Sequence, residues 1–212
     1  MSKEKNKFYV VWIGAKPGVY PNWPECQKQI NGYPGAKYKG FKTYPAAIEA
    51  FKSGPTNYWG KDYFESSLTK EQIGLIGKPI NKSVAVDAAW NTATLEMEYQ
   101  GVMIETGEVI FRKGPYKDAT NNVGEFLAIV HALALLKKQN SSLPIYSDSR
   151  NAIGWVMNKA HRSNLKQTKK NKEVFDLLER ADNWLNNNTY PNKILKWETK
   201  AWGENPADFG RK

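Results

Sequence analysis

An aspartate lies inside the most strand-like apolar run of the chain, and this placement constrains the fold strongly. Asp87 follows Ser83-Val84-Ala85-Val86 and precedes two alanines, a run typical of a buried β-strand. A carboxylate in such a run is costly unless it has a partner. We therefore expect Asp87 to belong to a site that the fold assembles from distant segments.

The pattern after Asp87 predicts an α/β domain with a mixed sheet. Strands expected at 94–104 and from 109 follow the first without an intervening helix, and a helix then opens near Asn122. The later elements expected are a strand at 143–148, helices at 149–158 and 172–187, a strand at 193–199, and a short terminal helix at 203–208. A meander followed by alternating helices and strands is typical of a mixed sheet with flanking helices.

Four carboxylates can converge only through such a fold. Asp87 and Asp148 end apolar strand runs, and Glu125 lies near a helix start. Asp208 lies in the expected terminal helix. Converging carboxylates repel each other at neutral pH, so their cluster needs cations. Oxygen ligands suit Mg²⁺ or Mn²⁺ rather than zinc, and two such ions can support phosphoryl displacement.

Three of these acids also have a purely structural interpretation. Glu125 could complete a capping arrangement at its helix, and Asp148 could cap the helix that follows it. Asp208 could be a surface acid near the basic C-terminus. The metal-site hypothesis therefore depends on all four side chains meeting in space.

The net charge of +10 is concentrated near the N-terminus. Residues 1–54 hold nine lysines and three acids, a net of +6. A basic excess favours an anionic partner, with nucleic acid first, and its concentration indicates a separate binding module. A strand at 8–13, a helix from Asn22, a strand at 36–41 and a helix at 45–52 predict a small ββαβα unit.

The rest of the composition excludes several classes of protein. No apolar stretch is long enough to span a bilayer, and the first residues lack a secretory leader. The single Cys26 suits a reducing compartment. We expect a cytoplasmic monomer with no membrane association and no obligatory protein partner.

The segment 54–80 is predicted to connect the domains 1–53 and 81–212. It begins with helix-breaking residues and ends in a glycine-rich stretch. Trp59, Tyr63 and Phe64 are unusual for a free linker. They could dock onto a domain or mark a short helix at 61–68, and the sequence leaves both open.

Residues 7–52 resemble the hybrid-binding domain of type-one ribonucleases H, a module also found in caulimovirus viroplasmins. The likeness lies in Phe8-Tyr9-Val10-Val11, Gly18-Val19-Tyr20, Trp23-Pro24-Glu25-Cys26 and 36–41. It implies that Trp23 and Tyr38 pack against deoxyriboses of the DNA strand and that Lys39 contacts a phosphate. The family's usual second lysine is Gly40 here. Trp23 could instead simply pack on the sheet.

Residues 81–212 resemble the catalytic domain of the same family. The matching segments are Ala85-Val86-Asp87, 120–128, 145–149 and Ala207-Asp208. The resemblance implies that Asp87, Glu125, Asp148 and Asp208 bind two Mg²⁺ ions, with Asp87 bridging them. Glu204 looks like the glutamate that a subset of the family has in place of a loop histidine. Its role would be proton handling or the release of product and metal, and its alternative is an exposed surface acid.

The resemblance also implies substrate contacts. Thr120 and Asn122 would hold a DNA phosphate, and Asn121 would face the RNA strand. Trp155 would stack on a DNA sugar or else be a core residue, and Ser163 is a further phosphate-pocket candidate. The basic stretch 159–172 is either a binding protrusion or a solvated loop, and His131 is expected to be structural.

The sequence thus predicts an endonuclease that cuts the RNA strand of RNA–DNA hybrids and leaves 5′-phosphate and 3′-hydroxyl ends. The expected fold is a ribonuclease H-like five-stranded mixed sheet with flanking helices, preceded by a small α+β hybrid-binding domain. Two alternatives are a non-catalytic hybrid-binding protein and a transposase or integrase core acting on DNA.

Overall fold

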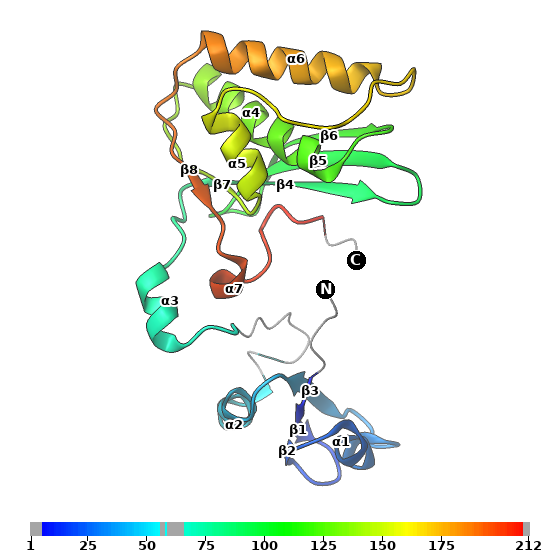
Figure 1. Cartoon of the computed structure of the whole chain (residues 1–212). Helices are drawn as coiled ribbons and strands as arrows, with labels where there is room; N and C mark the ends of the chain where they lie inside the picture. Colours follow the sequence, from blue (N-terminus) through cyan, green and yellow to red (C-terminus); the bar gives the residue numbers. More distant parts are fainter. Residues whose placement is uncertain (1–5, 56–57, 59–65, 210–212) are drawn as a thin grey trace. The chain divides into compact units, whose positions relative to one another are not determined.

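The computed structural model describes residues 6–55, 58 and 66–209 (Figure 1). The chain forms two compact units, 1–67 and 68–212. Trp59, Tyr63, Phe64 and most of the expected helix at 61–68 lie outside the described residues.

The N-terminal unit is a three-stranded antiparallel sheet with two helices. Its elements are β1 (Phe8–Ile13), β2 (Gly18–Tyr20), α1 (Trp23–Ile30), β3 (Lys37–Phe41) and α2 (Tyr44–Ser53). The strand order is β2-β1-β3. Asn22 caps α1 by accepting a hydrogen bond from the Glu25 amide, as the sequence predicts. The expected ββαβα order is confirmed.

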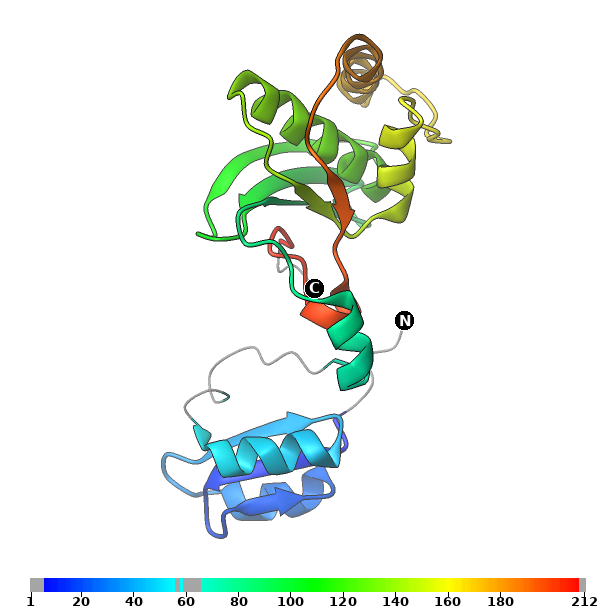
Figure 2. The ribbon, with the colours of Figure 1, turned by 90° about the vertical axis from the view of Figure 1, so that its left-hand side faces the viewer.

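Side chains alternate between the two faces of this small sheet. On one face Val10, Trp12 and Phe41 pack with the alanines of α2, which lies across the sheet in Figure 2. Tyr58 belongs to the same core, since it is 8% exposed and its ring stacks on Trp12 at 6.0 Å. The N-terminal core therefore extends into the segment predicted to be linker.

The C-terminal unit contains the expected five-stranded mixed sheet, in the order β6-β5-β4-β7-β8. The strands are β4 (Val84–Asn91), β5 (Glu96–Met103), β6 (Val109–Tyr116), β7 (Ile145–Ser147) and β8 (Ile194–Lys196). Strands β4, β5 and β6 form an antiparallel meander, whereas β7 and β8 add in parallel beside β4. The predicted fold class is confirmed.

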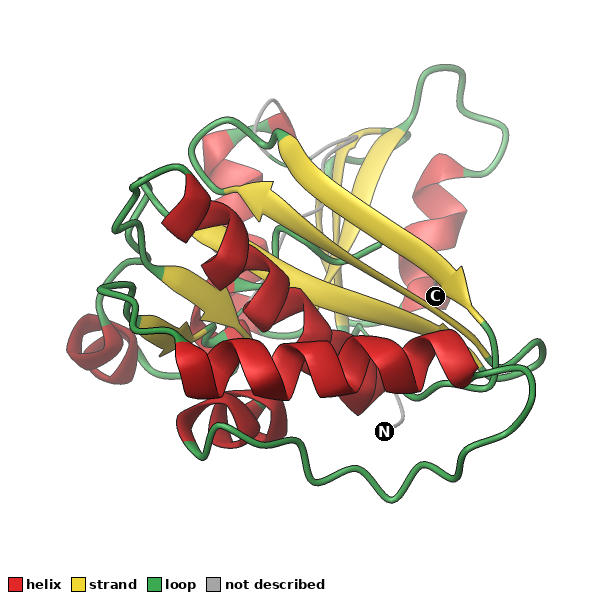
Figure 3. Cartoon of the chain, turned by 90° about the horizontal axis from the view of Figure 1, so that it is seen from above, coloured by secondary structure: helices red, strands yellow, loops and turns green. Residues whose placement is uncertain are grey.

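Helices gather on one face of this sheet. They are α4 (Asn121–Lys138), α5 (Arg150–Met157) and α6 (Lys172–Asn187), whereas the short α7 (Thr199–Trp202) lies beyond the other face (Figures 1 and 3). Helix α4 is the centre of the core. A Cβ added to Gly124 would come within 2.7 Å of the Ala88 side chain, so glycine permits a close approach of α4 to β4.

Two predictions about secondary structure are wrong. The segment 203–208 is a turn rather than a helix, because Gly203 adopts φ +87° and ends α7, and Pro206 has no amide hydrogen to continue it. A helix also occurs within the predicted linker: α3 (Lys70–Ile76). Thr69 and Gln72 form a capping box at its start, a signal that the sequence does contain.

The segment around α3 is attached to the C-terminal unit. The indole N–H of Trp202 donates to the Gly77 carbonyl at 2.8 Å, and the Ile80 amide donates to the Tyr146 hydroxyl at 3.2 Å. Within the described ranges, no helix is both long and apolar enough to cross a bilayer.

Candidate active site

Three carboxylates meet where β4, α4 and the end of β7 come together. Asp87 lies in β4 and Glu125 in the first turns of α4, and they are 7% and 8% exposed. Asp148 directly follows β7, which pairs in parallel with β4. One carboxylate oxygen from each residue lies within 4.8 Å of the other two. The structure therefore brings together three of the four acids predicted from the sequence as metal ligands.

Neighbouring polar groups hold Glu125 in place. The Asn121 side-chain amide donates to its Oε1 at 2.7 Å, and the Ser149 hydroxyl also bonds to the carboxylate. The capping interpretations of Glu125 and Asp148 are wrong. Thr120 is the N-cap of α4 without a side-chain cap bond, and Ser149 rather than Asp148 caps α5.

Asp208 reaches the site through long-range hydrogen bonds rather than a helix. The Asn205 side chain donates to the Val86 carbonyl of β4 at 2.9 Å, and Gln100 of β5 donates to the Ala207 carbonyl at 2.8 Å. Asp208 and Asp87 line one groove of about 530 Å³. Asp208 therefore borders the three-carboxylate cluster from the groove side.

Burial and mutual repulsion make the cluster hard to ionise. Burial, followed by the charge of Asp148, raises the pKa of Asp87 to about 8. Burial also raises the pKa of Glu125 to about 7, and the Asp148 charge adds to this against the hydrogen bond from Ser149. These carboxyl groups are fully ionised at neutral pH only if a cation neutralises them.

The donor set fits a hard divalent cation. All the converging ligand atoms are carboxylate oxygens, which suits Mg²⁺ or Mn²⁺ rather than zinc. The Oδ1 atom of Asp148 is buried and has no hydrogen-bond partner among the residues described. A buried carboxylate oxygen without a partner is costly, and a cation in the cluster removes that cost.

Glu204 lies apart from these carboxylates. It is exposed in the turn between α7 and Asn205, and it does not line the groove that contains Asp87 and Asp208. The described geometry therefore does not bring Glu204 into the cluster.

A second pocket brings together four predicted substrate contacts. It has a volume of about 400 Å³, and its lining includes Thr120, Asn122, Trp155 and Ser163. Arg162 and Lys166, which were not singled out from the sequence, also line it. The fifth predicted contact, Asn121, lies outside this pocket and bonds to Glu125. The basic stretch thus supplies one wall of a pocket that carries positive charge.

Trp155 and His131 have mainly packing environments. The Trp155 ring lies edge-on to Phe126 at 5.9 Å while it also lines the pocket, so it has core contacts, and its stacking on a DNA sugar stays a prediction. His131 stacks on Phe111 at 4.3 Å, and burial lowers its pKa. These contacts agree with the structural role expected for His131.

An aromatic patch made of Tyr9, Trp23 and Tyr38 lies on the N-terminal unit. The predicted pair has ring centroids 5.7 Å apart, and Trp23 and Tyr38 are 38% and 40% exposed. Tyr9, which was not singled out from the sequence, is the third member, and its ring lies 5.4 Å from that of Trp23. Trp23 therefore packs on the sheet, and more than a third of its surface is still exposed to solvent.

Lys39 is not part of this patch. Strand alternation places Lys39 on the face of β3 opposite Tyr38, and its ammonium group donates to the Tyr58 carbonyl at 2.9 Å. A Cβ on Gly40 would approach the Asn6 side chain to 2.4 Å. A lysine at position 40 therefore requires Asn6 to move.

Comparisons with known proteins agree with this geometry. A family model described as RNase H matches residues 81–198, and one described as the ribonuclease H1 N-terminal domain matches residues 7–51. Ribonuclease H of Schizosaccharomyces pombe is 23% identical, in an alignment that covers 99% of this chain and 97% of the relative. Ribonuclease H of Crithidia fasciculata is 44% identical over 82 residues, which cover 35% of this chain and 16% of the relative.

A solved structure of RNase H1 from the halophilic archaeon Halobacterium salinarum NRC-1 aligns with 54% of this chain and 83% of that chain. Its TM-score is 0.36 and its sequence identity is 17%.

The fold, the carboxylate cluster and the family matches together define a nuclease. The RNase H match alone spans more than half of the chain, and the chain belongs to the ribonuclease H family. It carries a ribonuclease H domain preceded by the family's N-terminal hybrid-binding domain. Enzymes of this family hydrolyse the RNA strand of RNA–DNA hybrids.

Proposed function

We propose that the C-terminal unit cuts the RNA strand by two-metal catalysis and leaves 5′-phosphate and 3′-hydroxyl ends. The observation that supports this proposal is the convergence of Asp87, Glu125 and Asp148 within 4.8 Å, with the Asp148 Oδ1 buried and unpartnered. Two bound Mg²⁺ ions would activate a water and stabilise the leaving oxygen.

The residues of the site have distinct tasks in this proposal. The charges of Asp148, Glu125 and Asp208 all act on Asp87, so Asp87 would be the central residue of the group that holds the cations. Asn121 fixes the orientation of Glu125 through its 2.7 Å hydrogen bond. Asp208 completes the ligand set from the groove. Glu204, four residues before Asp208 and outside the cluster, would act in proton handling or product release.

The pocket beside α4 is the proposed site for a phosphate of the DNA strand. Thr120 and Asn122 stand at the start of α4, where backbone amides and the helix dipole favour an anion. Arg162 and Lys166 add positive charge from the opposite wall, with Ser163 between them. Trp155 offers a ring edge for an adjacent sugar.

The aromatic patch of the N-terminal unit is the proposed second contact with the hybrid. Flat side chains on the surface of a basic unit are suited to contacts with the sugars and bases of a nucleic acid strand. Trp23 and Tyr38 provide the exposed surface, and Tyr9 supports Trp23 from β1.

One assay tests the whole proposal. Labelled RNA–DNA hybrid, duplex RNA, duplex DNA and single strands are incubated with Mg²⁺, with Mn²⁺ and with EDTA, and the product ends are mapped. We expect cleavage of the RNA in the hybrid alone, loss of cleavage in EDTA, and 5′-phosphate ends. Cleavage in EDTA, or 3′-phosphate products, would contradict the metal mechanism.

A further inference from the structure

The loop between α5 and α6 has no regular secondary structure and yet forms one wall of the phosphate pocket. This pocket loop comprises residues 158–171 and runs alongside α6 in Figures 1 and 3. It contributes residues 162–166 to the pocket lining, and Arg162, Ser163 and Lys166 are the members that suit a phosphate. A loop of this length must be held by specific contacts if these side chains are to keep one arrangement.

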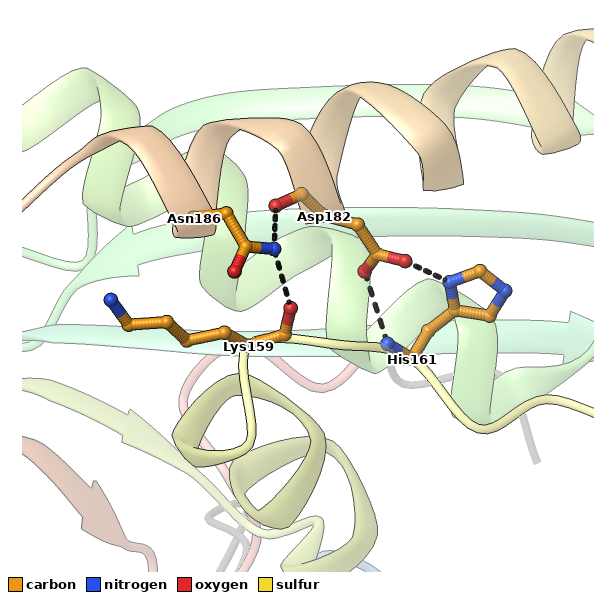
Figure 4. Close-up of polar contacts among 4 residues, drawn as sticks. All are labelled: Lys159, His161, Asp182 and Asn186. Carbon is orange, nitrogen blue, oxygen red and sulfur yellow. Dashed lines mark hydrogen bonds and ion pairs between the residues drawn. The ribbon is translucent and has the colours of Figure 1, made fainter.

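Helix α6 holds the start of the pocket loop, as Figure 4 shows. Asp182 accepts two hydrogen bonds from His161, one from its backbone amide at 3.0 Å and one at its ring Nδ1 at 2.7 Å. Asn186 donates to the Lys159 carbonyl at 3.1 Å. The two side chains of the His161–Asp182 pair are only about one quarter exposed. His161 directly precedes Arg162, so this contact fixes the position where the pocket wall begins.

Asn171 holds the end of the pocket loop. It is fully buried, and its side-chain amide donates to the carbonyls of Asp118 and Lys166, each at 3.0 Å. Its side-chain oxygen accepts from the Thr168 amide at 2.7 Å. One side chain therefore joins Lys166 on one wall to Asp118, which lies two residues before Thr120 on the other wall.

We propose that Asp182 and Asn171 are positioning residues for substrate binding, because they hold the pocket loop in the arrangement that receives a nucleic acid phosphate. The inference rests on the proposed function of the pocket. A wall that is ordered before binding loses less conformational entropy when the substrate arrives. Asp182 and Asn171 act through Arg162, Ser163 and Lys166 and do not touch the reacting atoms.

The test uses steady-state cleavage of an RNA–DNA hybrid by the full chain with Mg²⁺. Asp182→Ala is expected to raise KM about tenfold and to leave kcat within about twofold, because the carboxylate cluster is intact. Asp182→Asn should restore most of the affinity, since an amide can accept from the His161 backbone and donate to a neutral ring nitrogen. Glu179→Ala is the matched control, because it removes one negative charge from the same helix and should change neither constant.

A double variant separates positioning from general destabilisation. Because Asp182 acts partly through Arg162, Asp182→Ala combined with Arg162→Ala should raise KM by less than the two single effects combined. Asn171→Ala, assayed below its melting temperature, should raise KM in the same way as Asp182→Ala. An unchanged KM in Asp182→Ala, or fully additive effects in the double variant, overturns the positioning role.

The outcome for Arg162→Ala distinguishes this inference from the proposed function. If Arg162→Ala raises KM and Asp182→Ala does not, the pocket binds substrate and the positioning role is wrong. If Arg162→Ala also leaves KM unchanged, the phosphate pocket itself is wrong and the positioning role is overturned with it. A thermal melt of each variant shows whether a fall in kcat comes from unfolding.

Discussion

The carboxylate cluster and the aromatic patch are built in opposite ways. The cluster is buried and comes from β4, α4 and the end of β7, so the fold forces repelling charges together. The patch lies on a small sheet, and Trp23 and Tyr38 each expose more than a third of their surface. The cluster therefore lowers the stability of the metal-free fold, whereas the patch requires only exposed rings on a stable sheet. Substitutions in the cluster should alter catalysis, and substitutions in the patch should alter affinity.

The largest expected effect is that of Asp87→Asn. Removing this central carboxylate should lower kcat by roughly a thousandfold or more, because the stabilisation of the transition state is lost. Hybrid affinity should stay within about threefold, measured by filter binding in Ca²⁺. The control is Glu96→Gln, which removes a charge from the same groove but not from the cluster. If Asp87→Asn keeps full activity, the metal-site assignment fails.

A smaller effect, on the affinity for Mg²⁺, is expected when Asn121 is substituted. Asn121→Ala removes the hydrogen bond that orients Glu125, so the Mg²⁺ concentration for half-maximal activity should rise about 10- to 100-fold. The neighbouring Asn122→Ala should raise KM for the hybrid and leave the Mg²⁺ requirement unchanged, since Asn122 lines the phosphate pocket. Identical Mg²⁺ titrations of both variants would show that Asn121 does not act through Glu125.

A substitution in the aromatic patch should change the affinity for the hybrid and leave kcat unchanged. Trp23→Ala should weaken hybrid binding about tenfold by removing stacking surface, with kcat at saturating substrate unchanged. Tyr44→Ala is the control: Tyr44 is 53% exposed and packs on Phe8, which alternation places on the other face of the sheet from Tyr9. Equal affinity of wild type and Trp23→Ala for the hybrid would show that the aromatic patch does not bind it.

The smallest effect concerns stability and pH. Folding raises the pKa of Asp87 from 3.8 to about 8, so the folded state binds this proton more tightly than the unfolded chain. Its contribution to stability is complete below about pH 4 and is lost as pH rises through 8. In EDTA, Tm should therefore fall between pH 5 and pH 8 by several degrees more in wild type than in Asp87→Asn. Parallel melting curves for the two proteins would contradict this linkage.

The sequence predicts well those parts of the site that local pattern determines. Asp87 lies within β4 and Asp148 directly follows β7, and because these strands pair in parallel, the two side chains meet as a consequence of strand order. Asp208 is different, because it is brought to the site by the hydrogen bond from Asn205 to Val86, 119 residues away. No local signal marks such a contact. The helix expected at 203–208 is wrong for a different, local reason, since Gly203 ends α7 and Pro206 does not allow a new helix to continue.

The separation of Lys39 from Tyr38 was predictable from strand alternation alone, but it was not used. Lys39 follows Tyr38 directly, and the pair resembles a nucleic acid surface in the sequence, but alternation sends the lysine to Tyr58 on the other face. Tyr9 joins the patch because β1 pairs with β3, which places it opposite Gly40. Helix α3, in contrast, has a capping signal in Thr69 and Gln72 that the sequence analysis did not use.

The attachments at both ends of the predicted linker limit the length of chain that joins the two units. Tyr58 is packed in the N-terminal core, and the stretch from Thr69 to Ile80 is tied to the C-terminal unit through Gly77 and Ile80. The chain between Tyr58 and Thr69 can span at most about 40 Å. If the first unit binds a hybrid, this tether would give the second unit a high effective concentration near the same molecule.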